Sequence, residues 1–263
     1  MRIPYFHVDA FASKVFGGNP AGVCPLERWL PDELLREIAA ENNLSETAFF
    51  VRREDYFDLR WFTPTMEVDL CGHATLASAF VLFNELAHPG QSIRFKSQSG
   101  WLCAERRRDV IELDFPSRPP VPCEAPEPLI RSLGHKPREI LKSRDYVVVF
   151  DSEAEIAALK PDFDLLAKLE CLGVIVTARG KNVDFVSRFF APAAGVLEDP
   201  VTGSSHCSLI PFWAERLGKR EMLAHQVSRR GGELRCRLLG DRVAIGGQAI
   251  VYCRGQLDVV SGN

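Results

Sequence analysis

One segment of the chain recurs about half a chain length later, and this repeat constrains the fold more than any other feature. Residues 60–64 (RWFTP) are matched by residues 188–192 (RFFAP), and residues 71–75 (CGHAT) are matched by residues 202–206 (TGSSH). In each copy a strand-like run ends at a proline, and a glycine then opens a helical pattern. A repeat period this long is not that of a solenoid. It predicts a duplicated domain.

Each copy of the repeat predicts a helix that begins at a glycine, Gly72 in the first copy and Gly203 in the second. The first backbone N–H groups of a helix have no acceptor within the helix, so a helix N-terminus is a ready anion site. We therefore expect two similar anion sites. If the two sites face each other, they form a cleft.

Composition and charge exclude several classes of protein. With 263 residues, of which 46% are hydrophobic and 25% charged, the chain suits one large or two medium globular domains. Its net charge of −3 argues against a nucleic-acid surface, which needs a basic stripe. No apolar run reaches the about 20 residues that span a bilayer, and no secretory signal pattern is present. We expect a cytoplasmic protein with no nucleic-acid or membrane partner.

The potential metal ligands are scattered along the chain. Its 8 cysteines include no C-x-x-C pair, and its 6 histidines form neither H-x-x-x-H nor H-E-x-x-H, so we predict no metal site. Without an export signal the thiols are expected to be reduced, and most of them to pack as small core side chains. No glycine-rich nucleotide motif occurs. We therefore predict that the protein uses no cofactor.

Hydrophobic periodicity predicts few helices and many short strands. Helices are predicted over residues 31–42, 72–86, 163–169 and 203–217, the last with a kink or an early break at Pro211. A turn is predicted over residues 16–20, where glycines and an Asn-Pro pair disfavour regular structure. Strands are predicted over residues 5–11, 48–51, 57–62, 93–95, 102–104, 110–115, 146–150, 174–176, 185–190, 234–239, 243–245, 250–252 and 257–260.

The strands outnumber the helices and are joined by short turns, which favours antiparallel sheets wrapped around one main helix per half. The predicted fold class is therefore α+β, with two pseudo-symmetric domains. A proline-rich linker over residues 116–128 separates the halves, which are predicted as residues 1–117 and 118–253. The last strand, about residues 254–263, can pack on the first half.

Glu46 is the candidate for acid–base chemistry. A catalytic carboxyl group needs partial burial, and an apolar run over residues 48–51 follows it directly. With Arg52 and Arg179 taken as equivalent positions of the repeat, Gly173 stands opposite Glu46. One half thus carries a carboxylate where the other carries no side chain, as expected of a single catalytic group. The alternative is a surface carboxylate at a helix end.

His73 and Ser204 occupy equivalent positions, each directly after the glycine that opens its helix. Side chains there, together with free backbone N–H groups, can hold a substrate carboxylate or an enolate oxygen. The alternatives are a structural role for His73 and N-capping for Ser204 and Ser205. Asp199 can orient a partner or simply close a turn.

Cys71 suggests a different chemistry. Stereoinversion by two thiols requires a cysteine in each half, one to remove the α-proton and the other to return a proton from the opposite face. The second half has Thr202 at the equivalent position, and an unassisted threonine hydroxyl is a very poor base. An amino-acid racemase or epimerase that uses Cys71 stays an alternative function, as does a non-catalytic metabolite-binding protein.

A series of short motifs, taken in order, closely resembles the phenazine-biosynthesis PhzF-like family, within the diaminopimelate epimerase-like fold. The resemblance covers nearly the whole chain. Its motifs are residues 8–11 (VDAF), 18–20 (GNP), 43–47 (NLSET), 60–64 (RWFTP), 71–75 (CGHAT), 113–116 (LDFP), 188–192 (RFFAP), 198–204 (EDPVTGS) and 230–232 (RGG).

The resemblance implies two similar domains, each a barrel-like sheet around a central helix, with the active site between them. It also implies cofactor-free proton transfer, usually in a homodimer. The family's glutamate, which moves a proton between carbon atoms of a dihydro-hydroxyanthranilate, falls on Glu46. The supporting residues fall on His73, Asp199 and Ser204. Substrate-binding positions are expected at Asn19, Cys71, Gly72, Ala74, Thr202, Gly203 and Ser205.

Cys71 departs from the phenazine enzyme, which lacks this cysteine, and Thr202 departs from the related epimerases, which carry a second cysteine there. Both departures leave the substrate unassigned. The sequence therefore supports the hypothesis of a cofactor-independent isomerase that moves a proton on a small carboxylate-bearing substrate.

Overall fold

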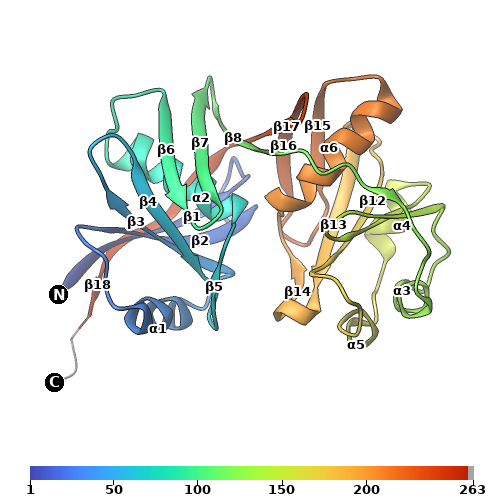
Figure 1. The fold of residues 1–263 in the computed structure, drawn as a ribbon, viewed down its shortest axis with the longest axis horizontal. Coiled ribbons are helices and arrows are strands. Elements are labelled where there is room, and N and C mark those ends of the chain that lie inside the picture. The colour runs from blue at the N-terminus through green and yellow to red at the C-terminus, as the bar shows by residue number, and fades with distance from the viewer. Residues whose placement is uncertain (260–263) are drawn as a thin grey trace. The chain divides into compact units, whose positions relative to one another are not determined.

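The computed structural model describes residues 1–259, which divide into two compact units. Unit 1 contains Met1–Asp114 and the described residues from Gly246 on, and unit 2 contains Phe115–Ile245. The chain passes from unit 1 to unit 2 within β8 (Val110–Pro116) and returns within β17 (Arg242–Gly247), as the colours of Figure 1 show.

Unit 1 is a mostly antiparallel sheet. Strand β1 pairs antiparallel with β2 and with β18, and the antiparallel pairs β3–β4, β4–β5, β6–β7 and β7–β8 follow. Two parallel pairs, β2–β3 and β4–β6, complete the order. The remaining bounds are β1 Arg2–Ala10, β2 Asn19–Leu26, α1 Asp32–Asn42, β3 Glu46–Arg52, β4 Phe57–Phe62, β5 Glu67–Val68, α2 Gly72–Phe80, β6 Ser92–Ser97, β7 Gly100–Arg107 and β18 Ala249–Asp258.

Unit 2 repeats this topology. The antiparallel pairs β10–β11, β12–β13, β13–β14 and β15–β16 and the parallel pairs β11–β12 and β13–β15 follow in the same order, and β9 flanks β10 as β18 flanks β1. The fold class is α+β, as predicted. The bounds are β9 Val121–Pro122, α3 Glu127–Leu133, β10 Glu139–Lys142, β11 Tyr146–Val149, α4 Glu153–Ala158, α5 Phe163–Leu166, β12 Val174–Arg179, β13 Phe185–Ala191, β14 Val196–Asp199, α6 Gly203–Leu217, β15 Glu221–Gln226 and β16 Gly232–Leu239.

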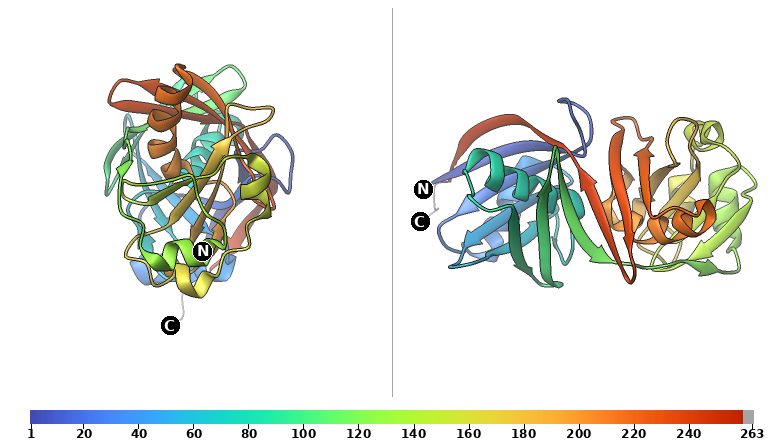
Figure 2. Two further views of the ribbon diagram at one scale, coloured as in Figure 1. Left: turned by 90° about the vertical axis from the view of Figure 1, so that its right-hand side faces the viewer. Right: turned by 90° about the horizontal axis from the view of Figure 1, so that it is seen from above.

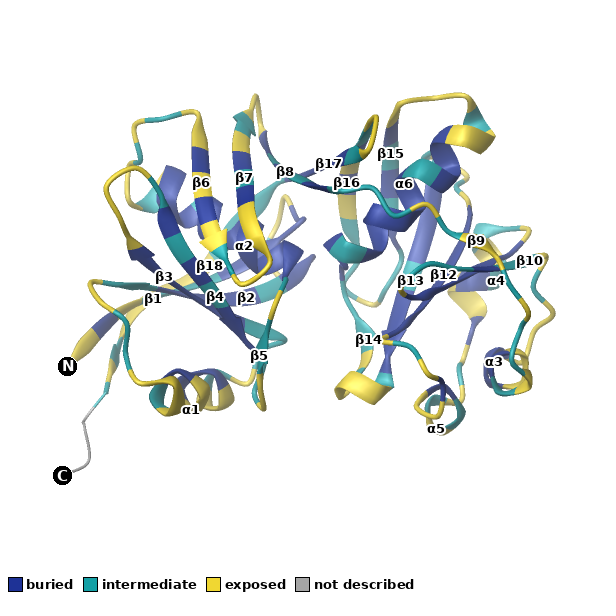
Figure 3. Ribbon diagram, viewed as in Figure 1, coloured by how far each residue is buried: buried dark blue, intermediate teal, exposed yellow. Residues whose placement is uncertain are grey.

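Each unit holds one largely buried helix, α2 in unit 1 and α6 in unit 2. Helix α2 carries small or apolar side chains on every side, and it is buried from Gly72 to Ala79 (Figure 3). A helix without a polar face suits the middle of a unit rather than its surface. The hydroxyls of Thr75 and Ser78 donate to carbonyls one turn back, so their burial leaves neither hydroxyl without an acceptor.

The repeated R-x-F-x-P motif forms the same ion pair in both units. Arg60 donates from Nε and Nη2 to the two carboxylate oxygens of Glu67, both at 2.7 Å. Arg188 makes the same two bonds to Glu198, at 2.7 and 3.0 Å. Each guanidinium also lies over the ring of the phenylalanine two positions on, at 5.0 and 4.9 Å. Because a bidentate pair fixes the arginine in one orientation, this contact accounts for the presence of the motif in both halves.

Helix α6 continues through Pro211 to Leu217, so the predicted early break does not occur. Proline has no N–H and therefore leaves the carbonyl four residues earlier without its helical donor. That carbonyl belongs to Cys207, and the backbone N–H of Arg118 donates to it at 2.8 Å. A donor from outside the helix thus replaces the missing bond.

Several predicted elements have different bounds. The turn predicted over residues 16–20 ends earlier, because Asn19 and Pro20 already pair with β1 as the start of β2. The helix predicted over residues 72–86 is α-helical only to Phe80 and continues as a π-helix over Val81–Glu85. The predicted linker contains the end of β8, the short strand β9 and the start of α3.

Strand β18 moves the predicted domain boundary. The strands predicted over residues 250–252 and 257–260 are one strand, Ala249–Asp258, and residue 260 lies outside the described residues. Residues 246–253, which the sequence assigns to the second half, belong to unit 1. The reason is that β18 pairs with β1 from Ala249 opposite Ala10 to Asp258 opposite Arg2, as the right-hand view of Figure 2 shows.

No helix within residues 1–259 is both long and apolar enough to cross a membrane.

Candidate active site

Alternation along two neighbouring strands places the candidate residues of unit 1 on one face of the sheet. In β3, Phe49 packs into the core cluster that contains the buried face of α1, so Glu46 points to the opposite face. In β2, Cys24 packs into the same cluster, so Asn19 also points to the opposite face. Helix α2 packs against both strands and carries His73 as its second residue.

His73 contacts both of these side chains. Its Nε2 lies 3.2 Å from Oε2 of Glu46, and its Nδ1 lies 3.1 Å from Nδ2 of Asn19. The His73 side chain is 5% exposed and that of Glu46 is 19% exposed. The carboxylate therefore reaches solvent, whereas the ring that holds it does not.

The charge state of His73 follows from its burial, which lowers the pKa of its ring from 6.5 to about 3. The ring is therefore neutral at neutral pH. The amide N–H of Asn19 donates to Nδ1, so the ring proton is on Nε2, which faces Glu46. Nε2 of His73 and Oε2 of Glu46 lie close together without an aligned hydrogen bond, so the ring places a neutral polar group beside the carboxylate and does not neutralise its charge.

Cys71 lies on the other side of the ring, with Sγ 3.5 Å from Nδ1 of His73. Ligand atoms of Cys71, His73 and Glu46 lie within 4.8 Å of one another, and all three are residue types that bind metals. However, Cys71 and Glu46 approach different ring nitrogens, whereas a single ion binds one nitrogen of an imidazole. The arrangement therefore suits proton transfer better than metal binding.

The N-terminus of α2 adds an anion site to this group. Cys71 is the N-cap residue, and its side chain accepts no bond from the helix. The predicted binding residues Gly72 and Ala74 lie in the first turn. Because no side chain caps the helix, its first backbone N–H groups can hold an anion beside His73.

The candidate residues of unit 2 form a separate network at the start of α6. The Thr202 hydroxyl donates to the Asp199 carboxylate. Gln226 donates to the Asp199 carbonyl at 2.7 Å and accepts from the Thr202 N–H at 2.9 Å. Asp199 is thus part of a turn held by Gln226.

Neither predicted serine caps α6, which begins at Gly203. The Ser205 hydroxyl donates to the Thr202 carbonyl at 2.8 Å. The Ser204 hydroxyl accepts from Nη2 of Arg144 at 3.2 Å. The N-capping alternative for these serines is therefore wrong. The guanidinium is paired with Asp145 at 2.8 Å, so the uncapped helix start itself is the feature that suits an anion.

The two units differ at the position of Glu46. Its counterpart in unit 2 is Gly173, directly before β12. A Cβ atom at Gly173 would lie 2.3 Å from Cζ of the Phe189 ring. In unit 2 the Phe189 ring therefore occupies the space that a side chain at this position would need. Of the two units, the first alone can present a carboxylate there.

Comparisons with known proteins agree with this description. The chain matches the phenazine biosynthesis-like protein family PhzC-PhzF over residues 8–255. It is 54% identical to an uncharacterized isomerase of Pseudomonas aeruginosa, over 98% of this chain and 99% of the relative. The chain belongs to the phenazine biosynthesis-like family.

Solved structures extend the comparison to the fold. A crystal structure of a PhzF family protein from Enterococcus faecalis superposes with a TM-score of 0.96 at 47% identity, and covers 98% of this chain and 100% of the other. A predicted epimerase from Pseudomonas aeruginosa superposes with a TM-score of 0.76 at 18% identity, over 98% and 100% of the two chains. The second likeness shows a shared epimerase-like fold alone. The predicted family and fold are thus confirmed.

Two residues of this phenazine biosynthesis-like protein lie at the candidate positions without being predicted. Arg144 contacts Ser204, and its only sequence signal is its place beside Asp145 at the start of a buried strand, β11. Gln226 is 1% exposed and bonds both Asp199 and Thr202. A polar residue on the buried face of β15 is a signal that could have identified it, because buried amides need partners.

Proposed function

We propose that this protein is a cofactor-independent isomerase that moves a proton between two carbon atoms of a small carboxylate-bearing substrate. The observation that carries the proposal is the close approach of Glu46 and His73, a partly exposed carboxylate 3.2 Å from a buried neutral ring. The contact lies at the start of a helix without a side-chain cap. The name isomerase on the relative from Pseudomonas aeruginosa supports the same reaction class.

In the proposed reaction the Glu46 carboxylate removes a proton from one carbon atom, and the electrons of that C–H bond move into the adjacent π system of the substrate. Negative charge develops on an enolate-like oxygen, where helix N–H groups stabilise it. The Glu46 carboxylic acid then returns the proton to a different carbon atom. The enzyme ends unchanged, and His73 keeps the carboxylate oriented through both steps.

Residues of unit 2 have supporting roles in this proposal. We assign Asp199 and Ser204 to substrate binding, because both lie at the start of α6 and Ser204 is bonded by Arg144. The first N–H groups of α6 offer an acidic ligand direct bonds, and the guanidinium, although paired with Asp145, offers further N–H donors. The proposal includes a homodimer, as the family resemblance implies, and analytical ultracentrifugation tests it.

A deuterium-incorporation screen tests the reaction class. Small cyclic and α-amino carboxylates are incubated with the enzyme in heavy water and analysed by mass spectrometry. The proposal predicts a substrate that gains deuterium and isomerises, and turnover that falls by about 10²–10⁴-fold in Glu46→Gln. Glu41→Gln removes an equal charge from an exposed position at the end of α1 and should keep wild-type turnover. Unchanged turnover in folded Glu46→Gln would refute the assignment.

Cys71 separates this proposal from an epimerase. The thiol contacts Nδ1 of His73, whereas Glu46 lies at Nε2, and the proposed proton transfer does not use the thiol. The isomerase proposal therefore predicts that Cys71→Ala keeps at least about one-tenth of the turnover. An epimerase that uses the thiol predicts an inactive variant, together with exchange and inversion at the α-carbon. A metabolite-binding protein predicts ligand binding without any solvent exchange.

A further inference from the structure

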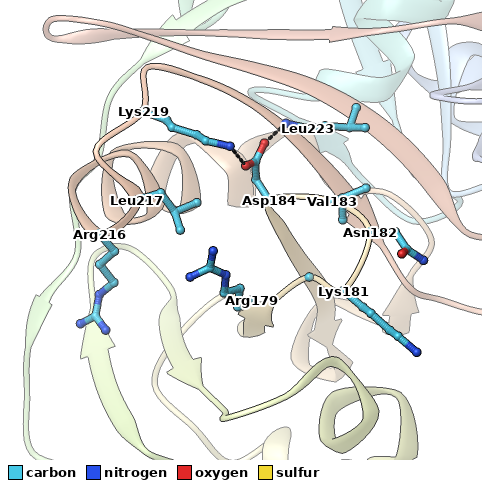
Figure 4. Close-up of a pocket in the computed structure, with 10 residues that line it drawn as sticks. Arg179, Lys181, Asn182, Val183, Asp184, Arg216, Leu217, Lys219 and Leu223 are labelled. Carbon is cyan, nitrogen blue, oxygen red and sulfur yellow. Dashed lines mark hydrogen bonds and ion pairs between the residues drawn. The ribbon is translucent and has the colours of Figure 1, made fainter.

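Unit 2 contains a cavity of ≈ 560 Å³ on its surface, apart from the start of α6. Its walls are the end of β12 with the following loop (residues 179–184), the end of α6 at Arg216 and Leu217, Lys219 and Leu223 (Figure 4). We refer to it as the cationic pocket. Its volume lies within the about 300–1,000 Å³ of small-molecule sites.

Cationic side chains outnumber carboxylates in the lining of the cationic pocket. Arg179, Lys181, Arg216 and Lys219 are cationic, whereas Asp184 is the single carboxylate of the lining. Asp184 is already engaged, because Lys219 donates to one of its oxygens and the Leu223 N–H donates to the other at 2.8 Å. Burial would raise the pKa of Asp184, but these bonds and the nearby charges of Lys219 and Arg179 hold it below its usual value. One carboxylate thus faces four cations.

The other cations differ in their partners. Arg216 is bonded by Glu139, which does not line the pocket. Arg179 and Lys181 form no ion pair with any residue of the described part of the chain. In Figure 4 the Arg179 guanidinium points toward the end of α6, and Lys181 extends on the other side of the pocket. Two cations without an ion pair among the described residues thus lie on the walls of one cavity, and the charge of Asp184 acts on Arg179 only at longer range.

The loop that carries these cations is well defined. Its Gly180 N–H donates to the Asp184 carbonyl at 3.3 Å, which closes the loop. The Lys181 N–H donates to Glu153 at 2.9 Å, which fixes the loop to α4. A Cβ at Gly180 would lie 2.6 Å from the Val183 carbonyl oxygen, so glycine is required for this close turn. The cationic side chains therefore project from a constrained backbone.

We propose that the cationic pocket binds a small molecule that carries two or more phosphate charges. The planar guanidinium of Arg179 suits bidentate contact with a phosphate group, and Lys181 supplies a second positive charge. The cavity is larger than one phosphate group, and Leu217, Leu223 and Val183 offer apolar contact to the rest of the molecule. A nucleic acid is a poorer fit, because the charge is confined to a concave site on a chain of net charge −3.

Titration calorimetry of the full chain with inorganic pyrophosphate tests this site. The expected result is a binding step that depends on the cationic pocket, with its affinity reduced at least about tenfold in the double variant Arg179→Gln/Lys181→Gln. The matched control is Lys160→Gln/Lys168→Gln, which removes two exposed lysine charges from the same unit and should bind as the wild type does. Glu46→Gln should also bind as the wild type does, because Glu46 belongs to unit 1.

Three outcomes overturn the proposal. The first is the absence of pyrophosphate binding to the wild type at low salt. The second is equal binding by wild type and the Arg179→Gln/Lys181→Gln variant, with folding of the variant verified by circular dichroism. The third is equally tight binding of citrate at the same ionic strength, since that would show a response to charge alone rather than to phosphate.

Discussion

The two units share a topology and an ion pair, yet they differ at the few positions that bear chemistry. Both pair their strands in the same order, and both hold the R-x-F-x-P arginine with a bidentate carboxylate. Unit 1 has Glu46 where unit 2 has Gly173 packed against Phe189. The difference teaches that the two copies keep the contacts that build the sheet, while only one of them carries the carboxylate that we propose as the acid–base group.

The helix starts differ in a related way. His73 of α2 lies beside a carboxylate, whereas Ser204, its counterpart in α6, accepts a hydrogen bond from the guanidinium of Arg144. That guanidinium is paired with Asp145. One helix start thus has a carboxylate beside it and the other has an arginine–aspartate pair. Both leave the first backbone N–H groups without a side-chain cap. The proposed function therefore assigns anion binding to both copies and proton transfer to the first.

Among exchanges of residues between the two copies, the largest expected effect comes from making unit 1 resemble unit 2 at the helix start. His73→Ser introduces the residue of the second copy and removes the ring that orients Glu46. Turnover should fall by about 100-fold, mainly in kcat rather than KM. His73→Gln, which keeps an N–H donor, should retain more activity. Steady-state rates on the substrate found by the deuterium screen measure both, and a fall confined to KM contradicts the positioning role.

A side chain added at Gly173, the counterpart of Glu46, should destabilise unit 2. Gly173→Ala puts a Cβ 2.3 Å from the Phe189 ring, so the ring must shift within a packed core. We expect a loss of about 1–3 kcal/mol in the free energy of unfolding, measured by urea denaturation. Gly255→Ala is the control, because nothing lies within 4 Å of its Cβ position and its φ is not positive. Equal stability of the two variants would show that the ring moves freely.

A buried histidine should make unit 2 sensitive to acid. Burial lowers the pKa of His206 from 6.5 to about 4. The folded chain therefore keeps this ring neutral while the unfolded chain protonates it, and stability is lost as the pH falls from 6.5 toward 4. The loss at pH 5 is about 2 kcal/mol relative to pH 7.5.

His206→Thr tests this, since threonine is the residue of the first copy at the equivalent position, Thr75. Both side chains contact the carbonyl at the start of their helix. The unfolding free energy at pH 7.5 exceeds that at pH 5, and this difference should be about 2 kcal/mol smaller in the variant than in the wild type. His135→Gln, at an exposed position, is the control. An unchanged pH difference in His206→Thr shows that another group causes the acid sensitivity.

The smallest expected effect is a difference in unfolding free energy between variants of the two arginine–glutamate pairs. Nη1 of Arg188 also donates to the carbonyls of Ile156 and Leu159, at 2.9 and 3.0 Å, whereas Nη1 of Arg60 donates to the more exposed Asp32. Lysine cannot supply this number of fixed donors. Arg188→Lys should therefore cost about 1 kcal/mol more unfolding free energy than Arg60→Lys. Equal urea midpoints and slopes for the two variants would contradict this ranking.

Much of the fold could be predicted from the sequence because its strongest signals are local. The glycines at residues 72 and 203 begin helices as predicted, and β4 has the predicted bounds. β15 is not predicted, because its inward face carries Met222, Ala224 and Gln226, which are not strong strand formers. The continuity of α6 through Pro211 depends on Arg118, about ninety positions away in the sequence, so no local rule could predict it.

The residues of the candidate site could be predicted from the sequence, but the contacts between them could not. The repeat identifies His73 and Glu46 as unusual positions, and alternation in β3 determines the face to which Glu46 points. Their 3.2 Å separation requires the parallel pairing of β2 with β3 and the packing of α2 on both. Arg144 was missed because its contact with Ser204 joins residues sixty positions apart.

The pairing of β1 with β18 means that the half of the protein translated first is the last to be completed. Strand β1 is synthesised early, but its partner β18 is synthesised only after the whole of unit 2. Throughout that interval one edge of β1 has no strand to pair with, and exposed edges of this kind recruit other chains. Unit 2 is one continuous segment and can fold without this delay. The nesting of one copy inside the other therefore leaves unit 1, which carries Glu46, with an open sheet edge until synthesis is nearly complete.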